Sequence, residues 1–357
     1  MACQHAAPSV LFSPRRTLIF CPPFCPYQDC DSRLSSTPLR FRRRGSFQRK
    51  CDGRRIPRFS CLCCNRGFSS QTFRGNYRCK LPTLHHQLMP LLCSKVTRRQ
   101  AARILGVNRK TVELRFRKFS HIAKDFHISA MERCRSSGGF SGIFQLDELE
   151  TYEHNRRIKP VTVAVTIERS SYFVLGAHPG TMASRSPLNE RYRLRKQTIE
   201  NQEGLRRSQS RLVVQASLDR LGRYLSPTAV MRLQSDMKKT YPTALAKAAS
   251  GRLFHHELTS SKDRRDYRNQ LFPINHTLAM MRDGMSCLVR RNWAGPKKRF
   301  GLQRHCWIWI AWRNYVRGIT GRTRTTPAQA LGVMSKAIKT QDLYFWRWPQ
   351  LMCKLAH

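Results

Sequence analysis

Acidic residues are scarce in this chain. Its 357 residues include 66 Lys and Arg but only 21 Asp and Glu, which gives a formal net charge of +45 at pH 7. From Met1 to Val112 the acids are limited to Asp29, Asp31 and Asp52. So large a positive charge repels itself unless a polyanion neutralises it, and nucleic acid is therefore the first partner to expect.

Long apolar runs are missing as well. No stretch reaches 18 apolar residues, and the best candidate, CWIWIAW at 306–312, is far too short to span a bilayer. In the first 20 residues the arginines follow the apolar part, which is the wrong order for a secretory signal. We therefore expect no membrane partner and a soluble protein of the cytoplasm.

Cysteine, in contrast, is plentiful. Fourteen cysteines without a secretory signal argue against a disulfide framework and favour a metal site. Zinc prefers four soft ligands in a tetrahedron, which two closely spaced pairs can supply. The candidate pairs are Cys25 with Cys30 and Cys61 with Cys64. Cys21 could replace Cys25, and Cys63 could replace Cys64.

The segment between these pairs alternates basic and aromatic residues, RFRRRGSFQRKCDGRRIPRF at 40–59. A segment this short and charged should fold only when metal closes it, and we expect a small hairpin here. Its pattern suits phosphate contacts with some stacking, but a solvated basic hairpin has the same composition. Residues 21–80 are assigned to a zinc ribbon.

A second pattern, from 88 to 120, has the features of a helix-turn-helix. Thr97 is a plausible N-cap of a first helix, and Gly106 ends that helix because glycine enters the left-handed turn at little cost. Asn108 then caps a second, basic helix. Ordinary helical hairpins share this pattern, but the glycine, cap and charge together favour DNA binding. The expected DNA-binding residues are Asn108, Arg109, Lys110, Thr111 and Arg115.

After SSGGFSG, an expected flexible joint at 136–142, acids gather for the first time in FQLDELETYEH at 144–154. They are Asp147, Glu148, Glu150 and Glu153, the last three being expected to be solvated or to support the site. Residue patterns predict antiparallel strands at 143–151, 160–169 and 171–180, the third ended by Pro179 and Gly180.

The remaining elements are expected further along the chain. The interval from 181 to about 227 is predicted to be helical, and a fourth strand ends at Asp236. A helix at about 276–292 carries Asp283, and Arg290 lies two turns later on the same face. A buried helix closing the sheet is expected within 304–324.

Three antiparallel strands, a helix, a strand and then helices is the element order of the ribonuclease H-like fold. In that fold the first and fourth strands are neighbours, so Asp147 and Asp236 would converge. The sequence resembles bacterial insertion-sequence transposases of the DDE class, in the branch with an N-terminal zinc ribbon and helix-turn-helix. The resemblance runs from about Cys25 to Arg317 and rests on FCPYQDC, RFSCLCCNRGFSSQTF, LLCSKVTRRQAARILGVNRKTV, QLDELETYEH, LQSDMKKTY and INHTLAMMRDGMSCLVRRNW.

The resemblance implies a multidomain α+β protein. Its parts are an unassigned tail at 1–20, a zinc ribbon at 21–80, a helical helix-turn-helix domain at 81–135, a ribonuclease H-like mixed α/β catalytic domain at 136–320 and a tail at 321–357. The implied partners are the terminal repeats of an insertion element and target DNA. A homodimer or larger assembly on DNA, at the bacterial nucleoid, is also implied.

The implied chemistry is metal-dependent strand cleavage and strand transfer. Three carboxylates hold two Mg²⁺ or Mn²⁺ ions, about 3.5–4 Å apart, at the scissile phosphate. Asp147 would bridge both ions, Asp236 and Asp283 would each hold one, and Arg290 would grip phosphate.

The sequence departs from the family's pattern around the third acid. Asp283 stands where many relatives have glutamate, Arg290 stands where lysine is common, and Gly284 weakens the helix. Asn275 and His276 could also contribute, or cap a helix. These departures leave open a catalytically inactive, transposase-derived DNA-binding protein or regulator. A ribosomal or RNA-binding protein would explain the charge and the ribbon, but not the paired acids or the helix-turn-helix.

Overall fold

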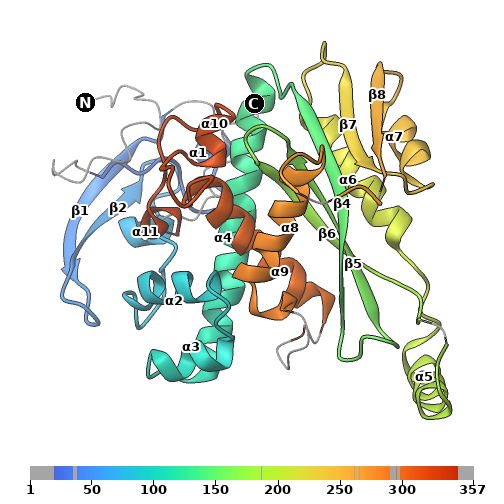
Figure 1. Ribbon diagram of the computed structural model, residues 1–357. Coiled ribbons are helices and arrows are strands. Elements are labelled where there is room, and N and C mark those ends of the chain that lie inside the picture. The colour runs from blue at the N-terminus through green and yellow to red at the C-terminus, as the bar shows by residue number, and fades with distance from the viewer. Residues whose placement is uncertain are drawn as a thin grey trace. The chain divides into compact units, whose positions relative to one another are not determined.

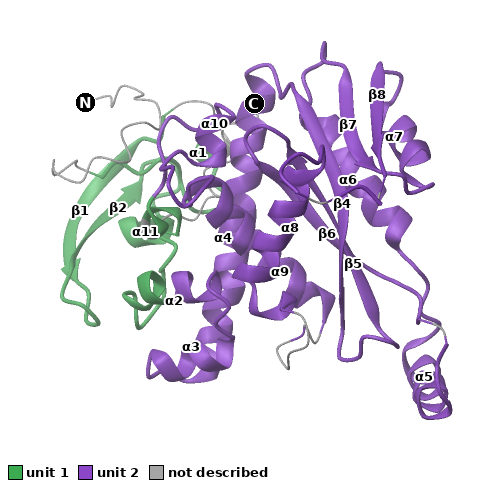
Figure 2. Cartoon of the chain, viewed as in Figure 1, with its two compact units in different colours: residues 1–87, 339–357 green, residues 88–338 purple. Residues whose placement is uncertain are grey.

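The computed structural model describes residues 20–34, 38–185, 187–260, 262–264, 266–289, 295 and 298–344. The chain is mixed α/β with two sheets, and it divides into two compact units (Figure 2). One unit comprises residues 1–87 with 339–357, and the other comprises residues 88–338. The predicted N-terminal tail at 1–20 lies outside the described residues except for Phe20, whereas the predicted C-terminal tail at 321–357 is described as far as Tyr344.

The first unit is built on a three-stranded antiparallel sheet in the order β1-β2-β3. The hairpin of β1 and β2 confirms the hairpin expected at 40–59. One face of the sheet carries an aromatic core, in which the ring of Phe59 lies 5.5–5.8 Å from those of Phe20, Phe41 and Phe68. The elements are α1 (Asp31–Leu34), β1 (Phe41–Gln48), β2 (Arg55–Cys61), β3 (Gly67–Ser69), η2 (Ser70–Phe73) and α11 (Thr340–Leu343).

The second unit is organised by a five-stranded sheet in the order β6-β5-β4-β7-β8 (Figure 1). β4 pairs antiparallel with β5, and β5 with β6, whereas β7 runs parallel to both β4 and β8. β5 is buried at every position, so the apolar run at 160–169 forms the core. The strands are β4 (Ile143–Tyr152), β5 (Pro160–Glu168), β6 (Val174–Thr181), β7 (Met231–Asp236) and β8 (Phe254–Thr259).

One strand end was predicted wrongly, and one strand was not predicted. β6 continues through Pro179 and Gly180, which pair with Val163 and Thr162 of β5. β6 is an edge strand, where a proline can sit with its nitrogen turned away from the ladder. β8 was not predicted, because its FHHELT sequence is mostly exposed and lacks a buried apolar face.

Helices cover both faces of this sheet. α6 packs on β5 and β6, and α7 packs on α6. α8 contacts β4 from the opposite face, α9 packs on β6, and α4 packs along α9 (Figure 1). The helices are α2 (Leu84–Leu92), α3 (Arg98–Ile104), α4 (Arg109–Ser136), α5 (Glu190–Glu203), α6 (Ser210–Tyr224), α7 (Tyr241–Ala249), α8 (Phe272–Gly284), η3 (Ser286–Leu288), α9 (Arg299–Tyr315) and α10 (Pro327–Ala330).

Some helices follow the sequence closely. α9 is the buried helix expected within 304–324. The helical interval from 181 becomes two helices separated after Gly204, and α5 has no buried residue. Among the described residues, no helix is both long and apolar enough to cross a membrane.

The joint at 136–142 is held in place rather than flexible. Phe140 is 4% exposed, its N–H donates to Tyr224 O at 2.8 Å, and its carbonyl accepts from Ser226 N at 2.8 Å. Gly139 has φ +80°, and a Cβ there would lie 2.7 Å from Ser226 N. The predicted boundary between 135 and 136 therefore falls inside one compact unit.

Candidate functional site

The four predicted cysteine ligands converge in the first unit. Cys25 Sγ lies 3.7 Å from Cys64 Sγ, and Cys30 Sγ lies 3.8 Å from Cys61 Sγ. A tetrahedron with Zn–S bonds of about 2.3 Å has edges of about 3.8 Å, so these spacings suit a zinc ion. All four sulfurs lie within 4.8 Å of one another, whereas Cys21 and Cys63 are exposed.

The local chemistry favours a thiolate at Cys61. Burial opposes its ionisation, but Ser32 Oγ at 3.4 Å and the backbone N–H groups of Cys64 and Cys63 outweigh burial and lower the pKa of the Cys61 thiol to about 6. Cys63 N donates to Cys61 Sγ at 3.4 Å. Backbone donors turned toward a ligand sulfur orient it and stabilise its charge. The cluster is therefore a candidate structural zinc site.

In the second unit, Asp147 and Asp236 lie on the neighbouring strands β4 and β7. The parallel register pairs Gln145 of β4 with Gln234 of β7, and the same register continued two residues further sets Asp147 opposite Asp236. Neighbouring strands lie about 4.8 Å apart, so the two carboxylates can share a cation. The adjacency of β4 and β7 is the arrangement on which the predicted convergence of Asp147 and Asp236 depends.

The two aspartates also share one face of the sheet. Gln145 Nε2 donates to Gln234 Oε1 at 2.8 Å, so these side chains lie on the same face, and residues two further along point the same way. The first turn of α8 covers this face, since Ile274 N donates to Gln145 Oε1 at 3.0 Å. The candidate acidic site therefore lies beside α8.

A buried network on the other face supports the acidic pair. The side chain of Glu148 is 8% exposed, and its Oε1 accepts from Thr162 Oγ1 and Ser210 Oγ, both at 2.8 Å. Its Oε2 accepts from Lys238 Nζ and, at 3.1 Å, from Tyr241 OH. This network joins β4 to the segment that follows β7.

The same segments hold the aspartates. Asp147 Oδ1 accepts from Glu148 N at 2.7 Å, and Asp236 Oδ1 accepts from Lys238 N at 3.2 Å. Burial, followed by the negative charges of Glu148, Asp147 and Asp236, raises the pKa of Tyr241. Negative potential is thus concentrated at this point of a strongly basic chain, as cation binding requires.

The acids near Asp147 have distinct environments. Glu148 was expected to be solvated or supporting, and it is buried. Glu153 is also buried and accepts from Arg206 at 3.0 Å. Glu150 is solvated, with its side chain 50% exposed beside Arg185.

Asp283 lies on a different side of α8 from the acidic pair. The residues that α8 buries include Ile274, Leu278 and Met281, and a residue two beyond Met281 lies about 200° around the helix. The Asp283 side chain is accordingly 76% exposed, and it pairs with Lys95. Among the described residues, three or more potential ligands come within 4.8 Å only at the cysteines. This structure does not bring Asp283 to Asp147 and Asp236.

The helix that carries Asp283 also ends earlier than the predicted helix at 276–292. α8 runs from Phe272 to Gly284, and a Cβ at Gly284 would lie 2.7 Å from Trp309 Nε1. Helical spacing thus ends before Arg290, which lies outside the described residues. Asn275 is half-buried in the first turn of α8 and does not cap it, because the N-cap is Leu271. His276 stacks on Phe272, with ring centroids 5.7 Å apart.

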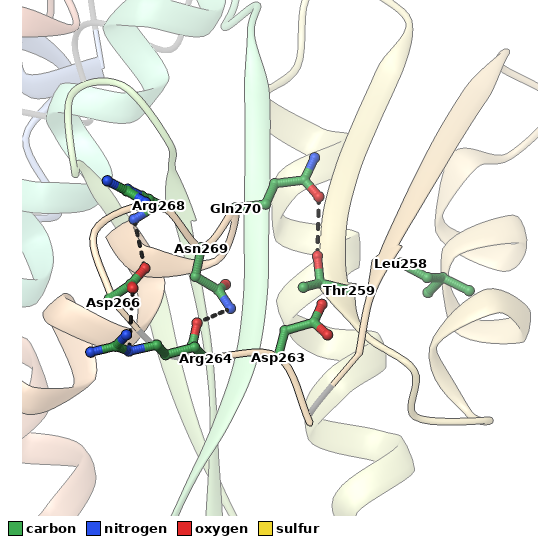
Figure 3. A pocket seen from close by; sticks show the side chains of 8 residues that line it. All are labelled: Leu258, Thr259, Asp263, Arg264, Asp266, Arg268, Asn269 and Gln270. Atoms are coloured by element: carbon green, nitrogen blue, oxygen red, sulfur yellow. Dashed lines mark hydrogen bonds and ion pairs between the residues drawn. The ribbon is translucent and has the colours of Figure 1, made fainter.

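A pocket of about 430 Å³ follows the C-terminal end of β8, and no sequence pattern predicted it (Figure 3). Thr259, which pairs with Asp236 in the β7–β8 register, donates from Oγ1 to Gln270 Oε1 at 3.0 Å. Asp263 and Asp266 add carboxylates to the lining. The pocket therefore extends the polar edge beyond Asp236.

The caps and the left-handed turn predicted between 97 and 108 are present. Thr97 and Gln100 form a capping box at α3, Gly106 has φ +61°, and Asn108 Oδ1 accepts from Lys110 N at 2.8 Å. Of the expected DNA-binding residues, Asn108, Arg109 and Lys110 are exposed. Thr111 and Arg115 are half-buried.

Charged contacts fasten α3 to the first turns of α4. Arg98 Nε lies 2.8 Å from Glu113 Oε2, and the Arg98 guanidinium lies 4.5 Å from the centre of the Phe116 ring. The N-terminal end of α4 is thereby held with its basic residues toward solvent.

No family model matches this chain, and no curated protein is significantly similar to it in sequence.

Proposed function

We propose that this protein is a DNA transposase of the DDE class, which binds the terminal repeats of an insertion element and cleaves and joins DNA strands. The observation that carries the proposal is that β4 and β7 are adjacent parallel strands whose Gln145 and Gln234 side chains meet on one face, the face expected for Asp147 and Asp236. The order β6-β5-β4-β7-β8, antiparallel on one side of β4 and parallel on the other, supports a ribonuclease H-like catalytic sheet.

In this proposal the protein's own groups hold and shape the site. Asp147 and Asp236 supply hard oxygen ligands that suit Mg²⁺ or Mn²⁺. The bound ions would activate a water or 3′-hydroxyl and stabilise the leaving oxygen. Glu148 and Lys238 fix the two strand segments, and the hydrogen bonds of Gln145 hold β4 to β7 and α8.

The remaining parts fit the binding of DNA ends. Asn108, Arg109 and Lys110 open a helix with their side chains exposed, as a recognition helix requires. The candidate zinc site would stabilise a ribbon that carries further positive charge. Because two DNA ends must meet, we propose that two or more copies assemble on DNA.

The decisive test is strand cleavage and joining on labelled DNA that carries the candidate terminal repeats, with Mg²⁺, comparing the wild type with Asp236→Ala. Cleavage by the wild type that is lost in the variant, with binding retained, is the expected result. Cleavage by Asp236→Ala at the wild-type rate would show that the acidic pair is not catalytic.

A catalytically inactive DNA-binding protein derived from such a transposase is the second candidate. The exposed Asp283, paired with Lys95 on the far side of α8, favours it because the third expected ligand is away from the other two. A wild-type protein that binds the repeats but never cuts them, with Mg²⁺ or Mn²⁺, would support this alternative.

A further inference from the structure

A cavity of about 980 Å³ lies on the zinc-ribbon sheet of the first unit. Its lining combines three arginines with exposed or half-buried aromatic rings, and none of the lining residues is acidic. The residues that matter for the argument are Arg44, Arg58, Arg78, Tyr27, Phe47 and Tyr77. We call this cavity the ribbon groove.

Side chains along β2 point alternately to the two faces of the sheet, and this places basic residues on the side of the groove. Phe59 is 2% exposed and belongs to the aromatic core, so its neighbours Arg58 and Ser60 point to the opposite, polar face. Ser60 Oγ accepts from Arg44 Nε at 3.3 Å, which ties β1 to β2 on that face. A basic surface therefore lies directly behind a rigid core.

Charge selects an anion for this groove. Residues 38–80 contain thirteen Lys and Arg but a single acid, Asp52, which is paired with Arg49. The surface potential of such a segment attracts anions such as phosphate and disfavours basic or neutral peptides as ligands.

The aromatic rings add a second requirement. Phe47 is 38% exposed, and the guanidinium groups of Arg66 and Arg78 lie 4.1 and 5.4 Å from the ring centres of Tyr27 and Tyr77. Aromatic rings and guanidinium groups also stack on nucleobases. In a duplex the base faces are stacked on one another and are not available to these rings. A single strand can use both the arginines and the rings.

We propose that the ribbon groove binds single-stranded DNA, with the arginines on phosphates and Phe47 and the tyrosines on bases. The choice of DNA rather than RNA rests on the proposed function, in which cleavage exposes single strands. The groove itself needs neither Asp147 nor Asp236.

The test uses the full-length, zinc-loaded protein and fluorescence anisotropy without divalent metal other than zinc. The probes are a labelled oligothymidine, an oligouridine of equal length and a duplex of unrelated sequence. Phe47→Ser and Arg58→Gln should each weaken oligothymidine binding about tenfold, since stacking on one base is worth about 1–3 kcal/mol. Duplex binding should change less than about twofold.

Arg43→Gln is the matched control. Arg43 is exposed on β1 and pairs with Phe59, so its side chain lies on the face opposite Arg58 and the substitution removes the same charge. It should change oligothymidine binding by less than about twofold, because Arg43 lies outside the groove and one removed charge contributes only a general electrostatic effect. Zinc content verifies that each variant is folded.

Three results would overturn the proposal. They are unchanged oligothymidine binding by Phe47→Ser, an Arg43→Gln effect as large as that of Arg58→Gln, and tighter binding of oligouridine than of oligothymidine. Because the assay contains no Mg²⁺ and no cleavage, a failure of the proposed enzyme activity leaves its expected result unchanged. A failure in this assay likewise leaves the Asp236→Ala test standing.

Discussion

The cysteine cluster and the acidic pair differ in how their residues are brought together. Each half of the cysteine cluster comes from one short turn, and a single hairpin brings the halves to Sγ–Sγ distances of 3.7 and 3.8 Å. Asp147 and Asp236 lie on neighbouring strands but are 89 residues apart in the sequence, and Asp283 lies on a separate helix. The four predicted cysteines cluster in the structure, whereas of the three predicted acids two lie on adjacent strands and the third, Asp283, lies away from them. Spacing along the chain predicts ligands from turns better than ligands from packed elements.

Removal of zinc is expected to have the largest effect, because it should unfold the three-stranded sheet of the first unit and leave the second unit folded. Structural zinc contributes about 10–16 kcal/mol in small zinc domains, and the aromatic core of the ribbon is small. A chelator should remove hydrogen-exchange protection from β1 and β2 but leave it on β5. The control is Cys63→Ser, which should retain zinc, whereas Cys61→Ser should lose it. Protection of β1 and β2 that survives chelation would contradict this expectation.

Neutralisation of one aspartate is expected to have the next largest effect. Asp147→Asn removes a negative oxygen ligand, so Mn²⁺ binding measured by calorimetry should be lost, and cleavage should fall at least about a hundredfold. DNA binding measured in parallel should be unchanged, because the exposed end of α4 is untouched. Full Mn²⁺ affinity in Asp147→Asn would show that Asp147 is not a metal ligand.

Glu148→Gln tests the buried network behind the pair. The side chain of Glu148 is 8% exposed, so loss of its charge beside Lys238 should destabilise the second unit by about 2 kcal/mol. Urea unfolding followed by tryptophan fluorescence would measure this. Glu150→Gln is the matched control on the same strand, because the Glu150–Arg185 pair is exposed and should contribute less than about 1 kcal/mol. Equal effects of the two variants would refute a special role for Glu148.

Asp283→Asn should have the smallest effect. Asp283 and Lys95 have side chains 76% and 49% exposed, so loss of the pair should cost less than about 1 kcal/mol in the same unfolding assay. If the active state resembles this structure, cleavage should stay within about threefold of the wild type. A loss of cleavage as large as that of Asp147→Asn would mean that α8 moves to bring Asp283 to the acidic pair on DNA.

Local signals in the sequence predicted local structure well. The caps at Thr97 and Asn108 and the left-handed turn at Gly106 depend on a few neighbouring residues, and all three are present. β4, β5 and β7 have enough apolar character to be recognised from their own residues.

Features that depend on distant partners were harder to predict. Pro179 is tolerated only because β6 is at an edge, and β8 exists because β7 offers it a parallel partner. The direction of Asp283 depends on which face of α8 meets β4, which helical spacing alone does not reveal. Ser210 and Thr162 carry no motif, so their contacts with Glu148 could be found only in the fold.

The length and continuity of α4 have a mechanical consequence. Its 28 residues contain neither glycine nor proline, so it is a rod of about 42 Å without an evident hinge. Its first residues are exposed, and its later turns are buried against α9. A force on the side chains at the N-terminal end of α4 would rotate the whole helix together with the elements that it packs against. DNA bound at Arg109 would therefore have its path set by the orientation of the five-stranded sheet, and the two could not rotate independently.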